Sequence, residues 1–377
     1  DYLARNFSDG NLTSARLFPT SSTYTTIQKK FKDNIVYSPQ DAVVYYAYFN
    51  VNRQNYGHTK KTSDEQKNST KTALQNKNFR QALNFALDRT SYSAQSNGKD
   101  GATKTLRTLL VPPTFVQANG KDFGTLVEEK LAATGDEWKG VSFADAQDSL
   151  HNADKAKAEL AKAKSELQSQ GVQFPIHIDY VVDQSSSSLV QQADSMKSSI
   201  ETALGKDNVV LDLQMMDSDE VLNITLNVPS AADADWDLQG MVGWNPDYDD
   251  PSTYLDIFKT TSSENTKTFM GYDDPNNAAA AQVGLKDYDA LLDSAASETT
   301  DLNARYDRYA QAQAWLEDSS LVIPLTVGNG AAPVISRLTP FTGASMQVGD
   351  KNSSDYFKYV KPQEKVVTKK EYEQSRE

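Results

Sequence analysis

The sequence contains no cysteine among its 377 residues. Disulfide bonds, thiolate metal ligands, iron–sulfur clusters and cysteine nucleophiles are therefore excluded. The core alone must hold the fold, and a chain of this length can bury a substantial one. The lack of cysteine does not exclude an oxidising compartment.

Long apolar runs and a basic surface are also missing. No stretch is long and apolar enough to be a transmembrane helix, and no signal peptide precedes Asp1. Because the chain does not open on Met, we expect a processed or truncated N-terminus, so the missing leader says nothing about secretion. The net charge of −13 argues against a nucleic-acid partner and is compatible with a cationic or zwitterionic ligand.

Catalytic and metal-binding motifs are scarce. No Gly-x-Ser-x-Gly motif and no glycine-rich phosphate loop occurs, so an enzyme is the weaker class. The three histidines, His58, His151 and His177, lie far apart without the spacing of metal ligands. We predict no catalytic residue, metal site or cofactor.

A run of alternating aspartates resembles the start of a calcium-binding loop. Asp233, Asp235 and Asp237 match the spacing, but Leu238 stands where such a loop needs glycine and Trp244 where it needs glutamate. We therefore interpret the run as an acidic loop that leads into a strand.

The periodicity of apolar residues predicts an α/β fold. Strands are expected at 174–183, 208–216 and 236–242, alternating with helices at 187–204 and 218–226. Such alternation is typical of a parallel or mixed sheet. Further helices are expected at 77–95, 152–170, 285–298 and 301–318, an exposed polar loop at 53–75, and strands at 41–52 and 321–327. The last strand contains a proline, which favours the edge of a sheet.

The most informative loop is Gly243-Trp244-Asn245-Pro246-Asp247-Tyr248-Asp249-Asp250-Pro251, at the end of a predicted strand. Its prolines restrict the backbone and orient its carboxylates before any ligand arrives, which suits capture of a cation. An acidic surface turn is the simpler reading. A third reading is a carbohydrate-active enzyme that uses Asp247 with Asp249 or Asp250 as its carboxylate pair.

Four segments, taken in order, resemble one protein family. In chain order, they are the strand 48–52, the helix 78–89, the loop 243–251 and the strand 321–327. Together they resemble the oligopeptide-binding proteins of ABC importers, family 5 of the extracellular solute-binding proteins. The tail around 366–372 resembles that of the streptococcal Ali/Ami oligopeptide-binding lipoproteins.

The resemblance implies a periplasmic-binding-protein-like fold of type II, with two α/β lobes that close about a hinge. Family members are longer at the N-terminus, so this chain looks like the C-terminal part of one. Residues 1–75 would form the end of the first lobe and a hinge strand, and 76–318 the second lobe with the ligand loop. Residues 319–360 would return to the first lobe, and 361–377 would form an exposed tail.

The resemblance also implies a peptide site. Asp247 would bind the α-ammonium group of the peptide, the backbone of Gly243 and Asn245 would pair with the peptide main chain, and Trp244 would pack at the site. Main-chain pairing of this kind tolerates many side chains.

Three further positions complete the predicted peptide-binding set. Tyr48 would line the same wall, and Asn50 falls where enteric relatives carry a glutamate. Met241 stands where those relatives carry an arginine near the peptide carboxylate, so longer, protruding peptides become plausible. The implied partner is a membrane permease, with a monomer held at the cell surface by a lipid anchor. A same-fold binder of a sugar or a metal chelate remains an alternative.

Overall fold

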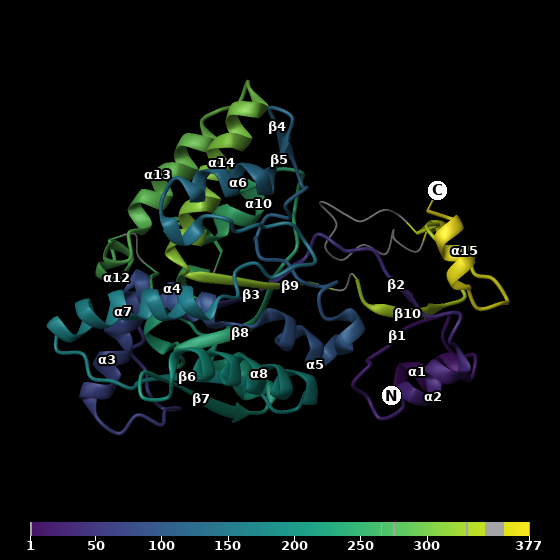
Figure 1. The fold of residues 1–377 in the computed structure, drawn as a ribbon, viewed down its shortest axis with the longest axis horizontal. Helices are drawn as coiled ribbons and strands as arrows, with labels where there is room; N and C mark the ends of the chain where they lie inside the picture. Colours follow the sequence, from purple (N-terminus) through teal and green to yellow (C-terminus); the bar gives the residue numbers. More distant parts are fainter. Residues whose placement is uncertain (1, 265, 274–275, 329–330, 344–357, 377) are drawn as a thin grey trace.

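The computed structural model describes residues 2–376 except 265, 274–275, 329–330 and 344–357. Two bodies are visible in Figure 1. The larger one is built from the middle of the chain, and the smaller one brings together both ends of the chain.

A five-stranded mixed sheet forms the centre of the larger body, with strand order β7-β6-β8-β3-β9. The strands are β3 (Val44–Phe49), β6 (Ile176–Asp183), β7 (Val209–Met216), β8 (Leu238–Trp244) and β9 (Val322–Val327). Strand β6 is parallel to β7 and β8, whereas β3 is antiparallel to β8 and β9. The sheet thus includes both β3 and β9. The expected domain ranges had assigned β3 to the first lobe and β9 to the segment that returns to the first lobe. The mixed α/β sheet is confirmed.

Strand β9 lies at the edge of this sheet, as its proline predicts. Tyr46 pairs with Pro324 and Tyr45 with Thr326, so the register shifts between them. A β-bulge and an edge position are the two places in a sheet where a residue without a backbone N–H is tolerated.

The larger body also contains the α-helices that surround the sheet. They are α3 (Asp64–Gln75), α4 (Lys77–Ala86), α5 (Arg89–Gly101), α6 (Phe123–Ala132), α7 (Ala153–Ser169), α8 (Ser187–Leu204), α9 (Ser218–Ile224), α10 (Ser252–Leu255), α11 (Thr266–Phe269), α12 (Ala278–Gln282), α13 (Leu285–Ala296) and α14 (Leu302–Ser319). A short hairpin pairs β4 (Gln117–Ala118) with β5 (Lys121–Asp122). Figure 1 places α6, α13 and α14 above the sheet and α8 beside β6 and β7.

The helix expected at 77–95 is two helices. Helix α4 ends at Ala86, and the side chain of Asp88 accepts a hydrogen bond from the backbone N–H of Ser91 at the start of α5. An N-cap aspartate with an extended backbone starts a new helix rather than continuing the old one.

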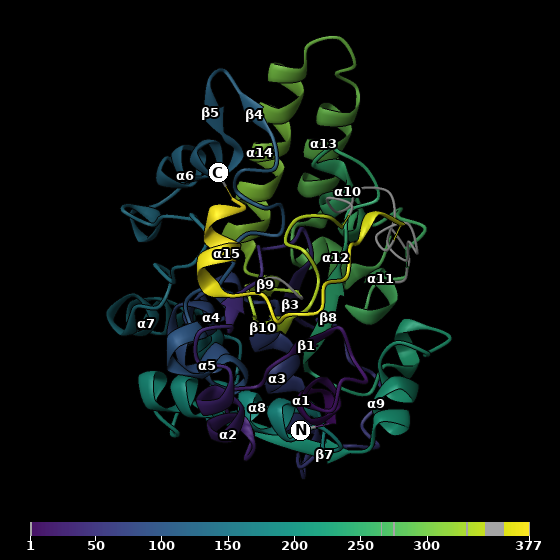
Figure 2. The same cartoon turned by 90° about the vertical axis from the view of Figure 1, so that its right-hand side faces the viewer.

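The smaller body contains an antiparallel sheet of order β1-β10-β2, formed by Ser14–Arg16, Pro333–Ser336 and Val36–Tyr37. Helices α1 (Tyr2–Ser8), α2 (Tyr24–Lys30) and α15 (Lys369–Gln374) surround it. Figure 2 views the molecule from this side. Within the segment expected as an exposed tail, Val367 is buried and its N–H donates to the carbonyl of Ser336 at 2.8 Å.

The chain enters and leaves the larger sheet at adjacent positions. Val44 at the start of β3 pairs with Val327 at the end of β9, and on its other side with Trp244 at the end of β8. The N–H of Gly328 donates to the carbonyl of Val43 at 3.0 Å. The end of β8 therefore lies beside the two chain segments that connect the bodies. We call this region the passage between the two bodies.

The polar segment 53–75 is not the exposed loop that we expected, and this prediction was wrong. Its second half is helix α3, and its first half carries two fully buried cations, Arg53 and Lys61. Arg53 lies 2.7 Å from Asp179, 2.8 Å from Asp235 and 3.1 Å from Asp237. Lys61 contacts Asp179 at 2.6 Å and also Asp237. We call these five residues the buried ion cluster. Its carboxylates come from a distant part of the sequence, so a local pattern could not predict it.

Candidate functional site

The loop 243–251 begins where β8 ends beside β3. Pro246 is buried, and the N–H of Asp247 donates to the hydroxyl of Thr253 at 2.8 Å. The loop thus bends back onto the start of α10. The side chain of Asp247 is exposed, whereas its backbone is held. This arrangement presents an exposed carboxylate in the loop that follows β8.

Asp250 has a structural role in the same loop. Its carboxylate accepts two hydrogen bonds from Arg305, at 2.7 and 3.0 Å, and one from the hydroxyl of Ser252 at 2.6 Å. Burial acts to raise the pKa of Asp250, but these hydrogen bonds outweigh it and lower the pKa. A carboxylate held by a bidentate arginine is a poor partner for a second cation or for proton transfer. A carboxylate pair for glycoside hydrolysis that includes Asp250 is therefore not favoured.

Gly243 allows an aromatic ring to lie over the strand. It pairs with Tyr45 across β3 and β8, and a Cβ at this position would come within 2.7 Å of two atoms of the Tyr45 ring. Because real Cβ contacts are essentially never that close, only glycine fits beneath this ring in this position. Tyr45 is 38% exposed, so its ring forms part of the surface beside the loop.

Trp244 and Asn245 follow Gly243 and are both half-buried. Trp244 packs against the main hydrophobic core. The side-chain oxygen of Asn245 is buried, and no hydrogen-bond donor among the described residues reaches it. An unsatisfied buried acceptor is costly, so a ligand or water that donates to it would be stabilised there.

Tyr48 and Asn50 lie elsewhere. Tyr48 is 1% exposed, and its ring packs edge-on against Trp236 with centroids 5.2 Å apart. Asn50 is also 1% exposed, and its N–H donates to the carbonyl of Asp237. Both lie toward the far end of β3 from the loop, so the structure does not bring them together with Asp247. Their contact with a ligand stays a prediction. Met241 belongs to β8, but its side chain lies outside the described part of the structure.

A metal site is not formed by the acidic run. Asp235 and Asp237 point into the buried ion cluster, where Arg53 and Lys61 neutralise them. Within the described ranges, no three His, Asp or Glu side chains are grouped so that they could hold a metal ion. Nor does any helix among those residues have the length and apolar character to cross a membrane.

A histidine missed by sequence reasoning borders the buried ion cluster. His58 lies 2.7 Å from Asp235 through Nδ1 and 3.0 Å from Glu220 through Nε2. The hydrogen bond with Asp235, against a smaller effect of burial, raises the pKa of His58. Its position in a polar segment had suggested only an exposed side chain.

Known proteins resemble this chain closely in sequence. Residues 2–266 match the family described as bacterial extracellular solute-binding proteins, family 5 Middle. The chain is 59% identical, over 100% of its length, to the oligopeptide-binding protein AmiA of Streptococcus pneumoniae. It is 57% identical, over 99% of its length, to the oligopeptide-binding protein SarA of Streptococcus gordonii. It spans 57% and 56% of those two proteins.

Solved structures confirm the expected fold. A substrate-binding domain of an oligopeptide ABC transporter from Bacillus anthracis aligns with a TM-score of 0.62 and 19% identity, over 96% of this chain and 56% of that one. The murein tripeptide binding protein MppA of Escherichia coli aligns with a TM-score of 0.58 and 17% identity, over 97% of this chain and 56% of that one. At these identities the likeness concerns the fold. The family match and the close relatives together show that the chain belongs to family 5 of the bacterial extracellular solute-binding proteins.

Proposed function

We propose that this protein captures oligopeptides outside the cell and delivers them to the permease of an ABC importer. The observation that carries the proposal is the loop after β8, which begins beside the passage between the two bodies and presents the exposed Asp247 carboxylate. Two close relatives are named oligopeptide-binding proteins, which supports the same ligand class.

The loop suits the N-terminus of a peptide. The α-ammonium group would contact Asp247, and a charge-assisted hydrogen bond of this kind is among the stronger polar contacts. The peptide main chain would pair with the backbone of Gly243 and Asn245. The buried side-chain oxygen of Asn245 could accept a hydrogen bond from the peptide. Tyr45 and Trp244 would flank the peptide with aromatic surface.

The remaining assignments follow from the family. The larger body corresponds to the second lobe, the smaller body contributes to the first, and the ligand is enclosed when they close about the passage. Met241 would lie where the peptide carboxylate is held, and Tyr48 and Asn50 would support the wall through β3. We assign no catalytic role, and we expect a monomeric lipoprotein at the cell surface.

The test replaces one carboxylate of the loop. Asp247→Asn should weaken binding of an oligopeptide at least tenfold by calorimetry, because losing one partner of a desolvated charge pair costs roughly 2–5 kcal/mol. Asp249→Asn is the matched control, since Asp249 is exposed in the same loop, and it should change the affinity little. N-acetylation of the peptide should reproduce the effect of Asp247→Asn. Equal affinities for wild type and Asp247→Asn would refute the assignment.

A further inference from the structure

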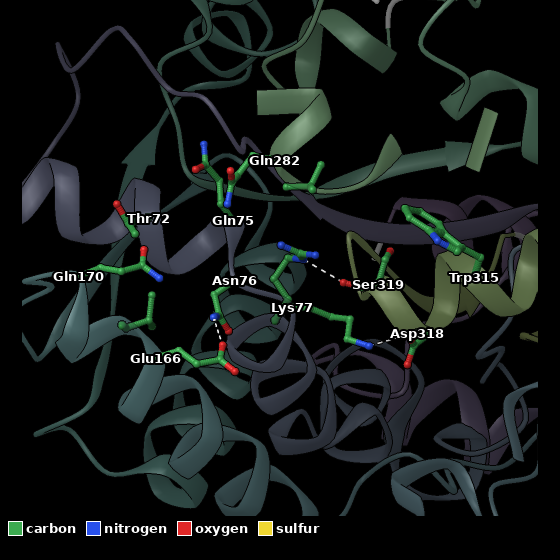
Figure 3. Close-up of a pocket in the computed structure, with 13 residues that line it drawn as sticks. Thr72, Gln75, Asn76, Lys77, Glu166, Gln170, Gln282, Trp315, Asp318 and Ser319 are labelled. Atoms are coloured by element: carbon green, nitrogen blue, oxygen red, sulfur yellow. Dashed lines mark hydrogen bonds and ion pairs between the residues drawn. The ribbon is translucent and has the colours of Figure 1, made fainter. Parts of the chain in front are cut away.

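A cavity lies in the larger body, away from the loop. Its volume is about 410 Å³, which is within the range of roughly 300–1,000 Å³ typical of small-molecule sites. Polar side chains from α3, α4, α7, α12 and α14 line it (Figure 3). The amides of Gln170 and Gln282 and the hydroxyl of Thr72 make no hydrogen bond with the described residues, so they remain available to a ligand.

One wall of the cavity is a buried arginine without an ionic partner. Arg80 is 1% exposed, and no carboxylate of the described residues lies within 4.0 Å of it. Its Nε donates to the carbonyl of Ser319 at 2.9 Å and its Nη1 to the carbonyl of Leu74 at 2.7 Å. Its Nη2 has no acceptor among those residues. Burial lowers the pKa of Arg80 to about 9, and the nearby charge of Asp318 opposes this effect only in part.

The cavity is also lined by the exposed carboxylate of Glu166. Glu166 accepts hydrogen bonds from the amides of Asn76 and Asn78, at 2.6 and 3.2 Å, and no cation of the described residues pairs with it. Helix α7 ends beside it, and the C-terminal carbonyls of a helix carry partial negative charge. The other carboxylate of the cavity, Asp318, is already satisfied by Lys77 at 2.7 Å and by the indole of Trp138 at 2.8 Å.

We propose that this cavity binds a small zwitterion with one carboxylate and one ammonium group. The carboxylate would accept from Nη2 of Arg80, and the ammonium group would donate to Glu166. Arg80 and Glu166 form no ion pair with each other. A ligand that carries both charges would therefore pair with both side chains. A simple anion or cation would satisfy one of them and be repelled by the other.

The cavity is separate from the peptide loop. Ser319 on its wall precedes the start of β9, whereas the loop lies beside the other end of the same strand. The five residue steps of β9 place these ends about 17 Å apart. The proposal therefore concerns an additional ligand and does not depend on peptide capture.

The experiment titrates the isotopically labelled protein with zwitterions of increasing length. Glycine, β-alanine, 4-aminobutyrate and 6-aminohexanoate are compared with acetate and methylammonium at constant ionic strength. The NMR signal of the Arg80 Nε–H reports on the cavity. At least one zwitterion should shift it to saturation with an affinity about tenfold above acetate and methylammonium, the factor expected for one added charge-assisted contact.

Three variants make the test specific. Glu166→Gln keeps a hydrogen-bonding side chain and removes the charge, so it should weaken binding of the zwitterion about tenfold. It should strengthen binding of acetate, because the charge that repels a simple anion is gone. Gln170→Trp places a bulky ring at the cavity lining and should abolish binding. Asp247→Asn should bind the zwitterion like the wild type, which separates this site from the peptide site. Equal binding of acetate and the best zwitterion, an unaffected Glu166→Gln, or no shift with any probe would each overturn the proposal.

Discussion

Removing Arg53 should destabilise the protein strongly, because its charge is the centre of the buried ion cluster. Its guanidinium lies 2.7, 2.8 and 3.1 Å from three carboxylates and also donates to the carbonyls of Asn55 and His58. In Arg53→Met, Asp179 and Asp237 would keep Lys61 as their cation in the cluster, whereas Asp235 would keep only its contact with His58. Breaking a buried ion pair from one side typically costs about 3–5 kcal/mol, a large part of a total stability of roughly 5–15 kcal/mol.

Urea unfolding followed by circular dichroism measures this loss. The matched control is Lys121→Met, which breaks a pair with Glu129 whose side chains are 45% and 53% exposed. Exposed pairs contribute about 0–1 kcal/mol, so the control should unfold close to the wild-type midpoint. A loss of less than about 1 kcal/mol in Arg53→Met would contradict the view that buried charge compensation holds this segment.

Three further predictions concern pH and packing. Burial acts to raise the pKa of Asp179, but Lys61 and the other partners outweigh it and lower the pKa to about 2. The ionised Asp179 therefore contributes fully to the free energy of unfolding above pH 3.8, its ordinary pKa, and this contribution is lost as pH falls toward 2. Asp179→Asn should flatten the pH dependence of unfolding between these two pH values. Burial raises the pKa of Glu317 to about 8, so its protonated form is favoured in the fold and stability is lost as pH rises from 4.5 to 8. Glu317→Gln should accordingly be more stable than wild type at pH 8, by roughly 1–3 kcal/mol, with little difference near pH 4; identical unfolding midpoints at pH 8 would refute this. Gly243→Ala should displace the Tyr45 ring, as seen in its NMR signals, and weaken peptide binding with little loss of fold; an unmoved ring would contradict the close approach.

Local periodicity was enough to predict much of the fold. Strands β6 and β7 alternate apolar and polar residues, and α8 ends at Gly205, so their limits were close to those observed. The proline of β9 correctly predicted an edge strand. These features depend on residues within a few positions of one another, which is the range that a sequence pattern reports.

Features that depend on distant residues were missed. Lys61 and Arg53 read as exposed in a polar segment, but the aspartates that neutralise them lie more than 100 positions away. The loop after β8 was identified as a candidate site from its own residues, whereas the bidentate contact between Asp250 and Arg305 required the fold. Tyr48 was assigned to the ligand wall from the family resemblance alone; its ring is buried against Trp236, and its contact with a ligand stays a prediction.

The pairing of Val44 with Val327 has a topological consequence. Paired residues of antiparallel strands have Cα atoms about 4.5–5.5 Å apart, so residues 44–327 form a closed unit whose two ends meet. This unit is an insertion within the smaller body, whose own sheet is assembled from segments on either side of it. A protein cut at these two positions would retain the loop after β8, the buried ion cluster and the polar cavity. Its ends could be joined by a short linker, or opened elsewhere by circular permutation, with the five-stranded sheet unchanged.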